Sequence, residues 1–341
     1  MKRIFALFLI VLFYQSCTPP KEYLTIDGLT QGTTYHIVVE SSPELNIEDL
    51  RVKVENLLSE VDNSLSIYND SSVISLINSN ISDKTDTLFR EVFRASAQIS
   101  NQCNGLFDIT VGPLVKAWGF GPDAHKKFDE TKLDSLLALV GMDKVRLEGD
   151  RIIKADPAIF IDVNAIAQGY TVDLLIDMLA AMGIDDCLVE VGGEVRSTGN
   201  KNGLGWHVGI DRPADGNYIP GADLQAKIRL DNSALATSGN YRKFYVEDGV
   251  KYSHTIDPRT GYPARHTLLS ATIIAPTCAV ADAWATACMV GGKETAISFI
   301  EKNASLEGYL VFSDEKGNMQ SWMSEGLKKW IQKTPGIRHN R

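Results

Sequence analysis

Residues 277–292 have the sequence TCAVADAWATACMVGG, which is the most informative segment of the chain. Asp282 and Thr286 lie one helical turn apart within it, and nearly all of their neighbours are small or apolar. A carboxylate on such a helix face is buried, and an unpaired buried charge is so costly that it either takes up a proton or binds a cation. Side chains four residues apart share a helix face, so these two oxygens suit a Mg²⁺ ion that also binds water and a phosphate. The structural alternative is that Thr286 bonds back to the Asp282 carbonyl and that Asp282 pairs with an arginine.

The composition is that of a globular protein with a substantial core. The chain has 341 residues, of which 44% are hydrophobic. Its formal net charge is −9, from 34 basic and 43 acidic side chains, and no run of Lys or Arg lies outside the termini. This pattern argues against nucleic acid as a partner. No spacing of the cysteines beyond residue 17 suggests a zinc site, so we expect them to be buried small hydrophobes.

The N-terminus has the pattern of a secretory signal. Lys2 and Arg3 precede the apolar run 4–14, which is too short to span a bilayer but has the length of a signal-peptide core. We therefore expect residues 1–16 to be removed as a signal peptide.

Cys17 directly follows this signal core, in an arrangement that resembles a bacterial lipoprotein box. Tyr14 and Gln15 depart from that pattern, because smaller or aliphatic residues are usual there. We expect residues 17–22 to form a lipidated tether that holds the protein on the periplasmic side of the bacterial cell membrane. The alternative is an ordinary signal peptide followed by an incidental cysteine.

Hydrophobic periodicity predicts an α+β fold in one globular unit. Apolar residues at helical spacing predict helices at 47–65, 87–102, 133–140 and 165–182. Alternating or β-branched runs predict strands within 23–40, with a turn near Gly28, and at 151–163, 187–191, 206–210, 226–230, 235–238, 243–246, 251–256, 268–274, 308–312 and 319–322. We expect a Gly192-Gly193-Glu194 turn to join 187–191 to 206–210, and Asp248-Gly249 to close a hairpin. Strands and helices mix without a regular βαβ repeat, which indicates the α+β class.

A second informative segment is IDVNAIAQGYTVD, residues 161–173. The pattern predicts a strand that ends at Asp162, a turn whose carbonyl can bind a metal, and a helix that opens at Ala167. Gly169 permits close approach of another backbone, and the helix start offers free N–H groups to an anion. The structural alternative is that Asn164 caps the helix and that Asp162 accepts N–H bonds.

A third segment, YSHTIDPRTGYP, covers residues 252–263. His254 stands in it just before a DPRTG stretch whose residue types favour a tight turn. A histidine there can titrate near neutral pH and act as a general base. Taken alone, it can equally be a structural histidine.

These segments occur in order together with several others, and the set resembles the ApbE family of FAD:protein FMN transferases. The resemblance covers nearly the whole chain after the signal. The motifs that carry it are TQGTTYHI (30–37), LSIYNDSSVISLIN (65–78), GLFDITVGPLVKAWGFG (105–121), IDVNAIAQGYTVD (161–173), VEVGGEVRSTG (189–199), ATSGNYRKF (236–244), HTIDPRTGYP (254–263) and ADAWATACMVGG (281–292).

The resemblance implies a two-part α+β architecture over residues 23–341, with FAD and a metal in the cleft between mixed sheet and helix subdomains. It implies that Mg²⁺ at the FAD pyrophosphate is bound by Asp282, Thr286 and the carbonyl of Ala165, and that His254 is the base. Residues at positions that contact FAD in the family are Gln31, Tyr68, Leu106, Phe107, Asp108, Asp162, Gln168 and Thr255. Gln31 replaces a usual Met and Gln168 a usual charged residue, which bears on affinity more than on the reaction type.

The reaction that the resemblance implies is attack by a Thr or Ser hydroxyl of an acceptor flavoprotein on the FMN phosphorus of FAD, with release of AMP. Such a transfer depends on neutralising phosphate charge and on in-line positioning. Acceptors would resemble subunits of sodium-pumping or electron-transport complexes in the membrane. Two alternatives stay open: hydrolysis of FAD to FMN and AMP, and a non-catalytic FAD-binding lipoprotein.

Overall fold

A computed structural model of the protein describes residues 21–120, 128–213, 221–240, 244–247, 250–253 and 255–332. Its centre is an eight-stranded antiparallel sheet in the order β1-β2-β5-β6-β9-β12-β13-β14. These strands are β1 (Tyr23–Thr30), β2 (Thr33–Glu40), β5 (Cys187–Val191), β6 (Glu194–Thr198), β9 (Ala234–Gly239), β12 (Leu268–Ala275), β13 (Glu307–Ser313) and β14 (Met319–Met323).

Three smaller strand groups accompany this sheet. A three-stranded sheet has the order β15-β8-β7, and two hairpins stand apart as β3–β4 and β10–β11. Their strands are β3 (Val145–Glu148), β4 (Arg151–Lys154), β7 (Trp206–Asp211), β8 (Leu224–Leu230), β10 (Phe244–Glu247), β11 (Val250–Ser253) and β15 (Ile331–Gln332). The helices are α1 (Ile47–Leu65), α2 (Val73–Asn78), α3 (Thr87–Gln102), α4 (Gly112–Ala117), α5 (Leu133–Leu137), α6 (Asn164–Ala181) and α7 (Cys278–Lys302), with single 3₁₀ turns at Glu130–Lys132, Met142–Lys144 and Gly326–Lys329. The predicted α+β class is confirmed.

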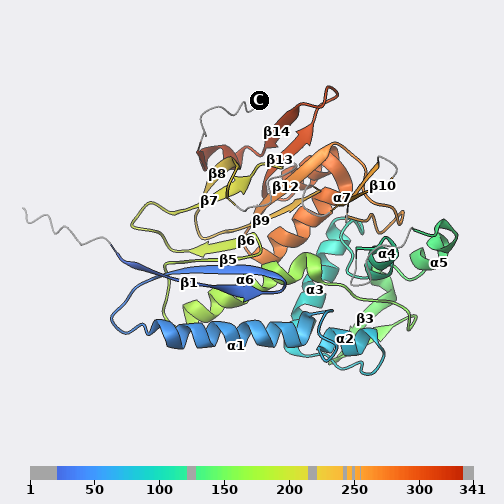
Figure 1. Ribbon diagram of the computed structural model, residues 1–341, viewed down its shortest axis with the longest axis horizontal. Coiled ribbons are helices and arrows are strands. Elements are labelled where there is room, and N and C mark those ends of the chain that lie inside the picture. The colour runs from blue at the N-terminus through green and yellow to red at the C-terminus, as the bar shows by residue number, and fades with distance from the viewer. Residues whose placement is uncertain are drawn as a thin grey trace, which may run out of the picture.

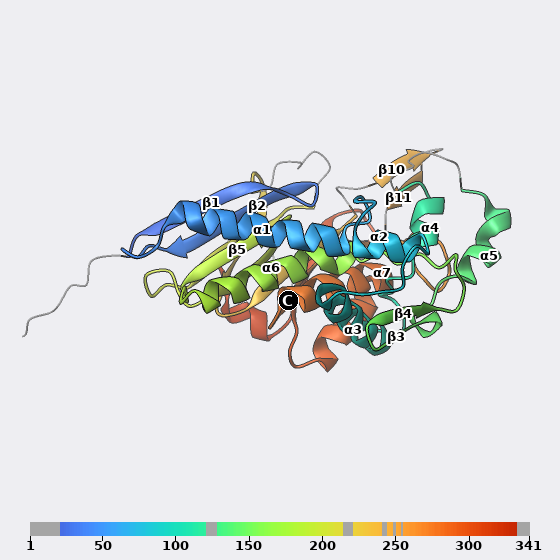
Figure 2. The ribbon, with the colours of Figure 1, turned by 90° about the horizontal axis from the view of Figure 1, so that it is seen from below.

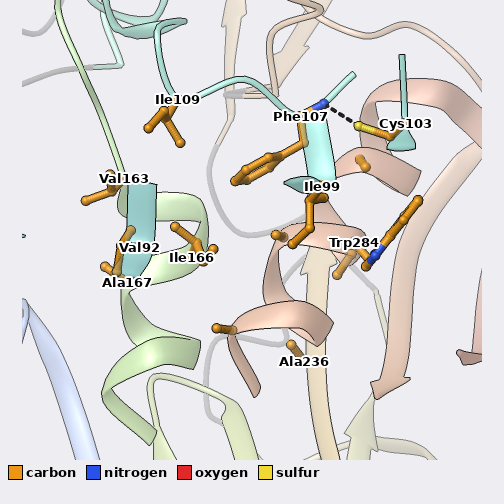
Figure 3. Packing of buried hydrophobic residues seen from close by; sticks show 14 of the residues in the cluster. Val92, Ile99, Cys103, Phe107, Ile109, Val163, Ile166, Ala167, Ala236 and Trp284 are labelled. Carbon is orange, nitrogen blue, oxygen red and sulfur yellow. Dashed lines mark hydrogen bonds between the residues drawn. The ribbon is translucent and has the colours of Figure 1, made fainter. Parts of the chain in front are cut away.

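Figure 1 shows the large sheet, and apolar side chains pack on both of its faces. On one face, α1 and α6 pack against β1, β2 and β5, and the two helices run side by side along the sheet (Figure 2). On the other face, the β7-β8-β15 sheet packs through its own apolar residues against β6, β9, β12 and β13. A further cluster joins α3, the opening of α6, and α7 (Figure 3). In the described part of the chain, no helix is long and apolar enough to cross a membrane.

The predicted bounds of α1 and α3 are confirmed to the residue, because a capping side chain and an apolar stripe agree at each. Asn46 accepts N–H bonds from Glu48 and Asp49 at the start of α1, and Asp86 accepts one from Phe89 at the start of α3. Such caps satisfy N–H groups that a helix start leaves without partners.

Two predicted features of the first half are wrong. Gly28 lies inside β1 opposite Tyr35, whose ring fills the space that a Cβ at Gly28 would need, and the turn is at Gln31 and Gly32 instead. Both turn residues have positive φ, 49° and 72°. The pair of strands predicted over 151–163 is not found: one strand, β4, ends at Lys154 and pairs with β3, which precedes it, while residues 155–163 continue as irregular chain.

Further differences concern connections and helix lengths. The Gly192-Gly193 turn joins β5 to β6, which the sequence prediction missed, rather than to β7. Helix α5 ends at Leu137, three residues early, while α6 opens at Asn164 rather than at Ala167. The short helices α2 and α4 and strand β3 were not predicted. The C-terminal helix continues to Lys302, beyond a break at Gly292 where φ is 78°. The proposed Asp248-Gly249 turn lies outside the described residues.

Helices α6 and α7 touch backbone to backbone. A Cβ built at Gly169 of α6 would lie 2.4 Å from the carbonyl oxygen of Cys278, the first residue of α7. This confirms the prediction that Gly169 allows close approach of another backbone. One turn further along α6, the Asp173 carboxylate accepts the N–H groups of Cys278 at 2.8 Å and Ala279 at 2.9 Å, and thereby caps α7.

Replacing Gly169 with Ala should lower the free energy of unfolding by about 2 kcal/mol or more, because overpacking against a rigid backbone outweighs the gain in helix propensity. Urea unfolding monitored by circular dichroism measures this difference. Ala180→Gly, on the exposed side of the same helix, is the matched control and should cost only about 1 kcal/mol. A Gly169→Ala protein as stable as the wild type would show that the two helices can separate freely.

Candidate active site

Asp282 is a buried carboxylate at the contact between α6 and α7. Its Oδ2 atom accepts a hydrogen bond from the Gly169 N–H at 3.2 Å. Burial is the main cause that raises the pKa of Asp282 to about 7; the Gly169 N–H opposes this shift, and the negative charge of Asp173 adds to it. Arg196 pairs with Asp173 at 2.7 Å, and within the described residues no basic side chain pairs with Asp282. The arginine partner of the structural alternative is therefore not found in that part of the chain.

The opening of α6 is distorted where it meets Asp282. Ala165 has non-helical backbone angles, φ −88° and ψ 15°, inside the helix. In an undistorted α-helix the Gly169 N–H would donate to the Ala165 carbonyl four residues earlier. Here the Gly169 N–H donates to Asp282, and the non-helical angles at Ala165 make its carbonyl oxygen a candidate to bind a cation.

Thr286 lies one turn after Asp282 on α7. Its hydroxyl oxygen lies 3.2 Å from Ser238 Oγ on β9. A carboxylate, a hydroxyl and a carbonyl form a set of hard oxygen donors, and these residues fit Mg²⁺. The described residues hold no group of three His, Cys, Asp or Glu side chains suited to a metal. With one carboxylate, an ion here would depend on phosphate oxygens of a ligand, which is the usual way that proteins bind Mg²⁺.

Tyr68 and Asp162 lie together beside this site. Tyr68 is 65% exposed, so its ring is open for stacking on a planar ligand. Partial desolvation and then the charge of Asp162 raise the pKa of Tyr68, while a hydrogen bond with Asn164 lowers it. Asp162 Oδ1 accepts the Asn164 N–H at 2.9 Å, and Asn164 does not cap α6, whose cap position is Val163. The structural alternative for this segment is therefore half right: Asp162 does accept an N–H bond, but Asn164 does not cap the helix.

Gln31 contacts α6, and Gln168 lies on that helix. Gln31 Nε2 donates to Thr171 Oγ1 at 2.7 Å, and Thr171 donates to the Ala167 carbonyl at 2.7 Å. The Gln168 amide lies against Gly192, where a Cβ would approach its Nε2 atom to 2.7 Å. Gln31 and Gln168, both predicted to contact FAD, therefore lie where the β1–β2 turn and the β5–β6 turn approach α6.

Residues 106–108 are buried in the adjacent core. Leu106 and Phe107 are 3% and 2% exposed, and the Phe107 N–H donates to Cys103 Sγ at 3.2 Å (Figure 3). Asp108 accepts bonds from the Thr110 N–H and hydroxyl and from the Met142 N–H, and burial raises its pKa. These side chains hold the loop in place, which leaves the backbone of this segment as the part best able to contact a ligand.

Thr255 is buried, and its hydroxyl donates to Asn240 Oδ1 at 3.1 Å. The adjacent His254 lies outside the described residues. The turn that follows is rigid, because Asp257 accepts two bonds from the Arg259 guanidinium and one from its N–H. Trp118 on α4 donates to the Gly261 carbonyl at 2.7 Å and ties this turn to α4.

The structure thus places Asp282 and Thr286 one turn apart on α7 and joins Asp282 to Gly169, four residues after Ala165 on α6. Tyr68 and Asp162 lie near Asn164 at the start of α6, Gln31 bonds to Thr171 on α6, and Gln168 lies on α6 itself. Sequence reasoning missed the supporting roles of Asp173 and Ser238. Both lie in motifs already noted, IDVNAIAQGYTVD and ATSGNYRKF, but nothing in either motif names the partner on α7.

Comparisons with known proteins identify the family of this chain. The model of the ApbE family matches residues 31–310. The FAD:protein FMN transferase of Vibrio cholerae serotype O1 is 33% identical over 332 residues, covering 95% of this chain and 97% of that protein. The enzyme of the same name from Haemophilus influenzae is 32% identical over 321 residues, covering 90% and 92%.

Solved structures give the same result. The flavin transferase ApbE from Vibrio cholerae superposes with a TM-score of 0.82 at 32% identity, over 91% of this chain and 100% of that one. The apo form of the flavinyl transferase ApbE from Pseudomonas stutzeri does so with a TM-score of 0.82 at 31% identity, over 91% and 97%. The family match, the extent of the sequence identity and the shared fold together place this chain in the ApbE family.

Proposed function

We propose that this protein is an FAD:protein FMN transferase, which moves FMN from FAD to a Thr or Ser side chain of an acceptor flavoprotein. The observation that carries the proposal is the buried Asp282 carboxylate, which faces the distorted opening of α6 without a basic partner in the described residues. The relatives that cover nearly the whole chain carry this enzyme name. In the reaction, the acceptor oxygen bonds to the FMN phosphorus, the pyrophosphate bond breaks, and AMP leaves with the bonding electrons.

Asp282, Thr286 and the Ala165 carbonyl would bind Mg²⁺, which supplies neutralisation of the pyrophosphate charge when bound. The donor set supports this assignment, as does the raised pKa of Asp282, because a cation removes the cost of burying its charge. The carboxylate is held by the Gly169 N–H and so stays oriented towards the opening of α6.

His254 would accept the proton of the attacking hydroxyl. Its position directly before Thr255 supports this role, since Thr255 is fixed to Asn240 at the end of β9.

FAD would lie along the opening of α6. We assign contacts to Gln31, Tyr68, the segment Leu106 to Asp108, Asp162, Gln168 and Thr255. The exposed Tyr68 ring supports stacking on a flavin or adenine ring, and the amides of Gln31 and Gln168 supply neutral hydrogen-bonding groups.

The sequence of residues 1–17 supports a place on the membrane. A lipidated Cys17 would hold the enzyme on the periplasmic side beside acceptor subunits of membrane electron-transport complexes. Cys17 lies outside the described residues.

Asp282→Asn should abolish Mg²⁺-dependent FMN transfer while the protein stays folded. Because the folded pKa of Asp282 is raised from 3.8 to about 7, metal-free wild type should lose stability as pH rises from about 4 to about 7, by an amount on the order of a few kcal/mol. The variant lacks this titrating group. Without metal, its free energy of unfolding should therefore fall less than that of the wild type when the pH is raised from 5 to 8. Turnover, and unfolding curves with and without Mg²⁺, test both parts. Asp177→Asn, exposed on α6, is the control, and normal turnover by folded Asp282→Asn would exclude the metal role.

His254→Ala should bind FAD normally but transfer FMN about 10²–10⁴-fold more slowly, as expected for the loss of a general base. Mass spectrometry of the acceptor, with AMP release measured in parallel, follows the reaction. His207→Ala, on the exposed side of β7, is the matched control and should be unaffected. Transfer at the wild-type rate would remove His254 from the mechanism, and FMN released free in solution by the wild type would favour hydrolysis.

Cys17→Ala should move the protein from the membrane fraction to the soluble fraction, because a lipid anchor requires the thiol of that residue. Fractionation with immunoblotting measures this shift, and Cys187→Ala, a change at a buried cysteine, is the control. Retention of Cys17→Ala in the membrane, or an unlipidated native N-terminus, would exclude the anchor.

A further inference from the structure

The contact between Ser238 and Thr286 assigns a role to a residue outside the donor set. Ser238 lies near the end of β9, opposite Ala271 of β12, and its Oγ lies 3.2 Å from Thr286 Oγ1 on α7. The neighbouring Thr237 faces the other side of the sheet, where its hydroxyl lies 2.8 Å from that of Thr272. Only one of the two adjacent hydroxyls on β9 therefore reaches Thr286.

The residue that follows β9 contacts the segment after His254. Asn240, two residues after Ser238, accepts the hydrogen bond of the Thr255 hydroxyl. The end of β9 and the residue after it therefore contact both Thr286 and Thr255. Strand pairing with β12 holds this end in a fixed register, with Gly239 opposite Ser270.

The direction of the hydroxyl contact follows from the chemistry of a bound cation. A Thr hydroxyl has one hydrogen to donate and two lone pairs. When a lone pair binds a metal, the oxygen becomes a poorer acceptor and its O–H a stronger donor, so the hydrogen must point away from the ion to an acceptor. Ser238 Oγ is the acceptor that the structure provides for Thr286.

We propose that Ser238 is a positioning residue that accepts the Thr286 hydroxyl hydrogen and so directs the lone pairs of Thr286 towards the metal. This inference rests on the proposed function, since it requires Thr286 to be a ligand. Mg²⁺ demands near-ideal octahedral geometry, so a hydroxyl free to rotate is a poorer ligand than one held in place. Residues that orient metal ligands typically affect metal affinity by about 10–100-fold.

The experiment measures metal binding without turnover. Mn²⁺ is titrated into the purified protein with a fixed concentration of ADP, which has a pyrophosphate but no flavin to transfer. Free Mn²⁺ is measured by electron paramagnetic resonance, and a titration of ADP without protein corrects for the Mn²⁺ that ADP itself binds. Ser238→Ala should raise the Mn²⁺ dissociation constant about 10-fold. Ser238→Thr keeps the hydroxyl and should stay within about twofold of wild type. Thr237→Val removes the neighbouring hydroxyl and is the matched control, also expected within about twofold.

Each outcome decides a separate question. Unchanged Mn²⁺ binding by folded Ser238→Ala, or equal weakening by Thr237→Val, would overturn the role of Ser238. Asp282→Asn is titrated in parallel, because its loss of Mn²⁺ binding shows that the probe reports this site. If Asp282→Asn bound Mn²⁺ as the wild type does, the metal assignment in the proposed function would fail. If only Ser238→Ala bound normally, that assignment would stand and the positioning role alone would be lost.

Discussion

The structure depends on the backbone contact between α6 and α7 at Gly169. Without a side chain there, the first turn of α7 lies directly against α6, and a Cβ would come within 2.4 Å of the Cys278 carbonyl oxygen. The same contact lets the Gly169 N–H reach Asp282 and lets Asp173 cap the start of α7. One contact, at Gly169, therefore determines both how the two helices pack and where the candidate metal ligand Asp282 lies.

This arrangement keeps a carboxylate where the fold alone disfavours it. Asp173 has two backbone donors and Arg196 to compensate its burial, whereas Asp282 has one backbone donor in the described residues. The two carboxylates share a helix–helix contact, yet Asp173 is compensated by protein donors while the pKa of Asp282 is raised to about 7. Such a difference between neighbouring groups is typical of a site where stability is given up for function.

The sequence predicted correctly those features that depend on neighbouring residues in the chain, such as helix bounds. The bounds of α1 and α3 followed from apolar spacing and the caps Asn46 and Asp86, and the pairing of Asp282 with Thr286 followed from helix periodicity. The pattern at 151–163 failed because Ile159 and Ile161 are buried by packing of irregular chain rather than by strand pairing, and both give the same alternation. Asp173 and Ser238 could not be assigned, because their partners on α7 lie 105 and 48 residues away in the chain.

The first part of helix α7, from Cys278 to the break at Gly292, is held by contacts from several elements. Asp173 caps its first turn, Gly169 and Ser238 contact its second and third turns, and the helix breaks at Gly292. Near this break, His266 Nε2 donates a hydrogen bond to the Met289 carbonyl oxygen at 2.7 Å. A carbonyl at the end of the first helical part therefore has a partner although the regular helix stops there. Both proposed ligands lie between the cap and the break. Contacts from α6, β9 and the segment before β12 fix the part of α7 that carries Asp282 and Thr286. Beyond Gly292 the helix is held separately, because Ala296 and Ile300 are buried in the core that also contains Trp284.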